Sequence, residues 1–191
     1  MRTRHPETTL QKQKGFTIIE LLLVVAILAI LGKLSMPYFT ATIESYRLNG
    51  AARRVAGDLR LAQSLAVSQG GIYGWHWGGD PNAISPPGAS FSRVEKDTGT
   101  ACSWPAVADT MTTNANVITN WTDLTKELTG ITIVSVKDNT PATIGGVAFD
   151  SRAAPANPCT AVAYPLTITI RNTSGTTRTV TVQNAGGVRI Q

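Results

Sequence analysis

The sequence has few of the residues that enzymes use for chemistry. Of its 191 residues only two are histidine and two are cysteine, and 15% are charged. It contains no G-x-S-x-G elbow, P-loop, dinucleotide-binding fingerprint or zinc-ligand pair. No internal repeat or long low-complexity tract is present. These absences argue against the common hydrolase, nucleotide-binding and zinc-binding classes, so we expect neither an enzyme nor a cofactor.

The remaining candidates for chemistry have simpler interpretations. His76 stands between Trp75 and Trp77, and strand alternation would place the two tryptophans on one face and the histidine on the other. We therefore interpret it as a structural or surface residue. The triplet Asp97-Thr98-Gly99 has the letters of an aspartic-protease site, but such a site needs two carboxylates brought together. This triplet follows Glu95-Lys96 in a polar stretch, which predicts a turn.

The charge is concentrated at the N-terminus. Four of the first 15 residues are basic and one is acidic, so this segment contributes +3 of the formal net charge of +5. Positive residues before an apolar segment hold that flank on the cytoplasmic side of a membrane. The remaining chain, at +2, gives little support for a strongly nucleic-acid-binding domain.

An apolar run follows this basic flank, over residues 16–36. As a helix these 21 residues would span about 31 Å, roughly the thickness of a hydrocarbon core. Gly32 and Lys33 mark its far edge, and we expect one membrane span. A secretory signal is the alternative, but a small-residue cleavage pattern is not evident after the run.

Glu20 is unexpected at the start of this span. An ionised carboxylate near the bilayer centre costs about 2.5 to 3.5 kcal/mol, less near the interface. No Lys or Arg lies near it within the span. One interpretation is a solvated side chain at headgroup level, beside the positive N-terminus of the helix.

The stretch 14–22, KGFTIIELL, closely resembles the class III signal of type IV pilins and of type II secretion pseudopilins. The resemblance implies that a prepilin peptidase cleaves between Gly15 and Phe16 and that the new amino group of Phe16 is N-methylated. It also implies a partner for Glu20, the N-terminal ammonium of Phe16 in a neighbouring filament subunit. Pro37 stands where this family often has a helix-bending proline.

After the span the pattern becomes that of an amphipathic helix over residues 37–70. Apolar residues spaced three and four apart form one face, and Gly70-Gly71 predicts its end. The arginines in this stretch, such as Arg53, Arg54 and Arg60, fall largely outside that face, as on a solvated helix surface; a nucleic-acid-binding patch is the alternative interpretation. The face consists of Ala52, Val55, Leu59, Ala62 and Ala66.

Beyond residue 71 the sequence predicts a β-rich domain. Alternation over 165–171 and 176–183, with a turn at 172–175, predicts an antiparallel hairpin. Further strands are expected over 72–77, 131–136, 147–149 and 188–190, whereas most of 78–125 remains unassigned. The predicted fold class is α+β: a leader (1–15), a transmembrane helix (16–36), its amphipathic continuation (37–70) and a periplasmic antiparallel β domain (71–191).

This layout resembles type II secretion pseudopilin H and the minor pilins of the FimT and FimU type. The segments RLNGAARRVAGDLRLAQSLAVSQGG, GGVAFDSRAAPA and GGVRIQ carry the resemblance. It implies a structural subunit anchored in the inner membrane and incorporated near a filament tip. The implied partners are a prepilin peptidase, the major pilin, other minor pilins or pseudopilins, and the inner-membrane assembly platform. Pilus and secretion machinery use the same signal, so both remain open.

Two further expectations depend on this setting. Cys102 and Cys159 would lie in an oxidising compartment, which favours a disulfide; closing the 57-residue separation (159 − 102) would contribute about 4 kcal/mol. Some FimT-type pilins bind DNA during uptake through a C-terminal Gly-Arg-x-Arg motif. Here the corresponding residues 186–189 read GGVR, without the first arginine. DNA binding through Arg171, Arg178 and Arg189 is therefore the alternative function.

Overall fold

A single long helix, α1 (Ile18–Gln69), is the first element of the structure. The computed structural model describes residues 15–79, 88–99, 104–106, 108–140, 144–156 and 162–191. Thr17 precedes the first helical residue, and Gly70 follows the last with a φ of 61°. This left-handed conformation is readily adopted by glycine and commonly ends helices. The predicted helix end is therefore confirmed.

The chain divides into two compact units, Met1–Thr42 and Ile43–Gln191. In the first, α1 is apolar on all sides, and its described side chains are almost all exposed. An 18-residue window of this helix has a mean hydropathy of 2.5, and none of it is buried. By length and composition the helix is able to cross a membrane.

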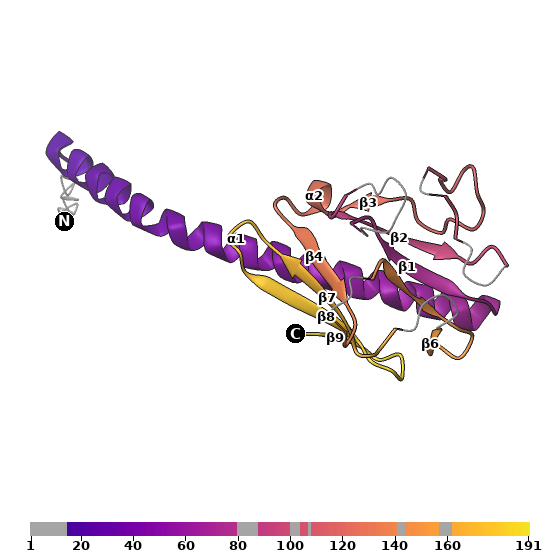
Figure 1. The fold of residues 1–191 in the computed structure, drawn as a ribbon. Coiled ribbons are helices and arrows are strands. Elements are labelled where there is room, and N and C mark those ends of the chain that lie inside the picture. The colour runs from indigo at the N-terminus through magenta and orange to yellow at the C-terminus, as the bar shows by residue number, and fades with distance from the viewer. Residues whose placement is uncertain (1–14, 80–87, 100–103, 107, 141–143, 157–161) are drawn as a thin grey trace, which may run out of the picture. The chain divides into compact units, whose positions relative to one another are not determined.

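The second unit contains two antiparallel sheets (Figure 1). One has the strand order β3-β2-β1-β5-β6, with β3 at Thr122–Asp123, β2 at Phe91–Lys96, β1 at Tyr73–Trp77, β5 at Gly146–Phe149 and β6 at Pro155–Ala156. The other has the order β4-β7-β8-β9, with β4 at Thr132–Lys137, β7 at Leu166–Arg171, β8 at Thr177–Val182 and β9 at Val188–Ile190. A short helix, α2 (Leu124–Glu127), joins β3 to the chain before β4.

The second half of α1 packs into one core with both sheets. Its buried face is the predicted one, and its alanines leave room for aromatic side chains such as Tyr73, Trp75 and Phe149. Alternate residues of β7 and β8 complete the core. Among the described residues, every buried hydrophobic side chain is Leu48 or a later residue. Ile43–Gln191 therefore holds its whole core, and we expect this part to fold on its own.

Most predicted strands are confirmed. The hairpin is β7–β8, with Arg171 opposite Thr177, and the predicted strands near 72, 131, 147 and 188 correspond to β1, β4, β5 and β9. The Asp97-Thr98-Gly99 turn is also confirmed, since the Gly99 N–H donates to the Asp97 carboxylate at 3.1 Å. The unassigned stretch contains β2 and β3, and β6 was also not predicted.

Candidate processing and assembly site

The predicted cleavage point lies just outside the helix. Gly15, Phe16 and Thr17 precede α1 in a non-helical conformation. The Phe16 side chain is 83% exposed, and no atom lies within 4 Å of the position that a Cβ on Gly15 would occupy. The bond between Gly15 and Phe16 therefore lies on non-helical backbone beside open space, where a peptidase can reach it.

Thr17 and Glu20 together begin the helix. The Thr17 carbonyl accepts from the Leu21 N–H at 3.2 Å, and its hydroxyl accepts from the Glu20 N–H at 3.3 Å. Thr followed three residues later by Glu is the spacing of a capping box. A carboxylate in the first turn also interacts favourably with the helix dipole. Within one chain, Glu20 is thus consistent with a helix-start role.

Beyond Glu20 the helix presents an uncovered apolar surface on every side. Gly32 has no neighbour within 4 Å of its Cβ position, and α1 continues through Pro37 to Gln69. Since proline has no N–H, one helical hydrogen bond is missing there. An apolar surface all round a helix requires lipid or other apolar helices to cover it. The exposed set includes Ile18, Ile19, Leu21, Leu22, Leu23, Val24, Val25, Ile27, Leu28, Ile30 and Leu31.

The structure separates the three candidate DNA-contact arginines. Arg178 lies opposite Ile170, a core residue, and its Nε donates to the Asn49 side chain on α1 at 2.9 Å. Arg171 lies on the other face of the same sheet. Arg189 pairs with Thr181 and shares that outer face, with its Cα about 16 Å from that of Arg171, an estimate from strand spacing and rise. Only two of the three are brought to one face.

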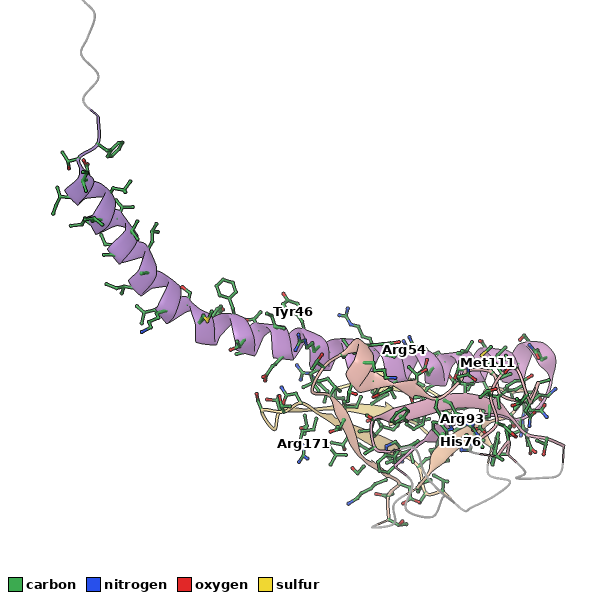
Figure 2. The ribbon with its side chains drawn as sticks, turned by 90° about the horizontal axis from the view of Figure 1, so that it is seen from above. Tyr46, Arg54, His76, Arg93, Met111 and Arg171 are labelled. Atoms are coloured by element: carbon green, nitrogen blue, oxygen red, sulfur yellow. The ribbon has the colours of Figure 1, made fainter. Side chains whose placement is uncertain are left out.

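A buried polar cluster occupies the outer face of β1 and β2. His76 lies opposite Arg93, on the face away from the core tryptophans as strand alternation predicts, and its ring centroid is 4.5 Å from that of Trp104. Arg93 is 1% exposed. Its Nε donates a hydrogen bond to the buried carboxyl group of Glu95, and its guanidinium lies 4.5 Å from the Trp121 ring centroid. Figure 2 labels His76 and Arg93 in this part of the domain.

Hydrogen bonds from Arg93 attach the chain after β2 to this face. The guanidinium donates to the carbonyls of Pro105 at 2.9 Å, Ala106 at 3.0 Å and Asp109 at 3.1 Å. The patterns described in the sequence do not predict this function of Arg93. The R-x-E spacing in β2 (FSRVEK) is the one sequence pattern that indicates an Arg93–Glu95 pair, because alternate residues of a strand share a face.

Burial shifts two pKa values in this cluster in opposite directions. Desolvation, with the nearby positive charge of Arg93, lowers the pKa of His76 from 6.5 to about 3. Desolvation outweighs the attraction of Arg93 for Glu95 and raises the pKa of that carboxyl from 4.5 to about 7. Both residues are thus held toward their neutral forms near pH 6.

Some predicted features lie outside the described residues. These are the leader up to Lys14 and both cysteines, Cys102 and Cys159. The disulfide therefore stays a prediction.

Comparison with known proteins identifies the N-terminal segment. The family described as "Prokaryotic N-terminal methylation motif" matches residues 10–32, the region that contains the exposed Gly15–Phe16 bond and the start of the apolar helix. The chain therefore carries a prokaryotic N-terminal methylation motif. No curated protein matches this chain.

Two solved proteins are similar to it in structure. The type IV minor pilin FimU of Pseudomonas aeruginosa is 16% identical, with 75% of this chain and 92% of FimU covered at a TM-score of 0.48. The minor pseudopilin EpsH of the Vibrio cholerae Type 2 Secretion System is 17% identical, with 76% of this chain and 96% of EpsH covered at a TM-score of 0.49.

Proposed function

We propose that this chain is a minor pilin or pseudopilin, a structural subunit of a type IV pilus or of a type II secretion pseudopilus. The methylation motif at residues 10–32 is the observation that carries the proposal. The exposed bond before α1 and the uncovered apolar helix after it support the proposal, because a filament subunit needs both.

In this proposal a prepilin peptidase cuts between Gly15 and Phe16 on the cytoplasmic face of the inner membrane. Phe16 then becomes the N-methylated first residue of the mature chain. The cut leaves Thr17 in place, so the helix keeps its capping residue. The β domain lies in the periplasm until assembly, when the apolar helix moves from lipid into a bundle of similar helices from the major pilin and other minor subunits.

Glu20 acts during that assembly. Its carboxylate, one turn from the new amino group, pairs with the Phe16 ammonium of a neighbouring subunit. Attraction is strong in an apolar bundle, but the desolvation of both ions offsets much of it. The pair therefore contributes more to the register between subunits than to their affinity, since a shifted subunit would leave two unpaired charges in apolar surroundings.

Substitutions at Glu20 separate this role from helix capping. Glu20→Gln keeps a side chain that a capping box accepts but removes the charge, whereas Glu20→Ala removes both. We expect both variants to be cleaved normally and both to be depleted from sheared filaments, measured by immunoblotting of filament and membrane fractions. Normal incorporation of Glu20→Gln would refute the charge-pairing role and leave only capping.

A further inference from the structure

The outer face of the sheet β4-β7-β8-β9 is unusually rich in hydroxyl groups. Residues between the buried positions Ile168, Ile170, Val180 and Val182 point away from the core. Strand pairing places these residues opposite one another in rows across the sheet. We call this surface the hydroxyl face; it comprises Ser135, Thr167, Thr169, Thr177, Thr179 and Thr181.

The described residues provide no hydrogen-bonding partner for these hydroxyls. Within the part of the chain that the structure describes, none of the six forms a side-chain hydrogen bond to a protein group. Thr177 is exposed, Thr167, Thr169 and Thr179 are half-buried, and Thr181 is 7% exposed. Each hydroxyl supplies one donor and two acceptor lone pairs. The face thus presents a set of aligned, unpaired hydrogen-bonding groups.

Positive charge surrounds the hydroxyl face. Lys137 lies opposite Thr167, and Arg171 and Arg189 are on the same side of the sheet. From strand spacing, Lys137 and Arg189 are about 14 Å apart across the sheet, and Arg171 is about 13 Å along β7 from the row that joins them. Figure 2 shows Arg171 on the side of the sheet away from α1.

No acidic residue opposes these cations on the four strands. Residues 132–137 and 165–191 contain neither Asp nor Glu. The nearest acid along β4 is Asp138, whose carboxylate accepts hydrogen bonds from the Thr140 hydroxyl and from the Ala163 N–H at 2.9 Å. The face is therefore cationic as well as hydroxyl-rich.

This chemistry favours one class of ligand. Sugar hydroxyls, like those of threonine, both donate and accept hydrogen bonds, and carboxylate or sulfate groups on a glycan would pair with Lys or Arg. Single-stranded nucleic acid is favoured less, because its binding depends on aromatic stacking and no aromatic side chain stands on the outward positions of β7, β8 and β9. Three cations also neutralise few phosphates of a duplex.

We propose that the hydroxyl face, with Lys137, Arg171 and Arg189 around it, binds an anionic polysaccharide. The hydroxyls contact the sugar ring hydroxyls, and the three cations pair with the acidic groups along the chain. This surface belongs entirely to Ile43–Gln191 and does not require the apolar helix. Binding and filament assembly are therefore separable.

The proposal is tested by isothermal titration calorimetry, which measures the binding of alginate oligosaccharides to the full-length chain in a neutral detergent. Neutral dextran and a short duplex DNA serve as the comparison polymers. Lys137→Gln combined with Arg189→Gln is expected to weaken alginate binding about tenfold or more, given the strength of charge-assisted hydrogen bonds. Thr167→Val combined with Thr181→Val, which keeps side-chain shape, is also expected to weaken it.

Arg178→Gln is the matched control. It removes one positive charge from the same sheet, but from its inner face, so its alginate affinity should equal that of the parent chain. Thermal unfolding of each variant shows whether the fold is kept. The proposal is overturned if alginate does not bind, if Arg178→Gln weakens binding as much as the double variant, or if duplex DNA binds more tightly than alginate and loses affinity in the same variants.

Discussion

The opposed pKa shifts of His76 and Glu95 lead to a quantitative prediction about pH. A His whose folded pKa is lowered contributes stability that is present above pH 6.5 and is lost as the pH falls toward 3. A carboxyl whose folded pKa is raised contributes stability that is present below pH 4.5 and is lost as the pH rises through about 7. Between pH 4.5 and 6.5 the two effects have opposite signs.

Each effect changes the free energy of unfolding by about 1.4 kcal/mol per pH unit. Over the two units of this window each residue alone would contribute roughly 2 to 3 kcal/mol, and together they nearly cancel. We therefore expect these two residues together to contribute little to the pH dependence of the stability of Ile43–Gln191 in this window.

Substituting either residue alone should reveal the pH dependence of stability that the other residue cancels. Glu95→Gln resembles the protonated carboxyl, so the fold should tolerate it at acidic pH, and its stability should fall by roughly 2 to 3 kcal/mol from pH 6.5 to 4.5. His76→Phe keeps an aromatic ring against Trp104 and should instead gain stability over the same interval. Urea unfolding at both pH values, followed by tryptophan fluorescence, measures each slope. Parallel pH profiles for the parent chain and both variants would refute the reasoning.

Two matched pairs of substitutions test the account of α1. Leu59→Ala removes a fully buried side chain and should lower the free energy of unfolding by about 2 to 5 kcal/mol. Leu61→Ala, at an exposed position of the same helix, should change it little. Equal effects of the two substitutions in urea unfolding would contradict the observed helix face. Gly70→Ala should destabilise by about 1 kcal/mol because of the positive φ. Gly57→Ala should stabilise by roughly 0.5 to 1 kcal/mol, since this position is helical and open; a loss in thermal stability at Gly57 would count against its exposure.

Periodicity in the sequence predicts the elements that have one face in the core. The apolar face of α1 and the alternation of β7 and β8 are examples, because burial of one side leaves a regular pattern. The methylation motif at residues 10–32 is equally visible, since such a motif is local in sequence.

The elements that the sequence left unassigned carry buried polar groups instead. In β2 the alternate positions are Arg93 and Glu95, which read as a solvated segment, yet both are 1% exposed. The Arg93 guanidinium is buried by hydrogen bonds to carbonyls of Pro105, Ala106 and Asp109, 12 to 16 residues along the chain, which local alternation does not show. The placement of Arg178 on the inner face likewise follows from strand register, which fixes the face of each side chain.

The proposed processing as a pilin-like subunit is tested most directly by intact mass measurement and N-terminal sequencing. The chain is recovered for this from membranes of cells that express a prepilin peptidase. The proposed function predicts a mature chain that begins at N-methylated Phe16. A chain that still begins at Met1, or one cut after residue 36, would contradict it.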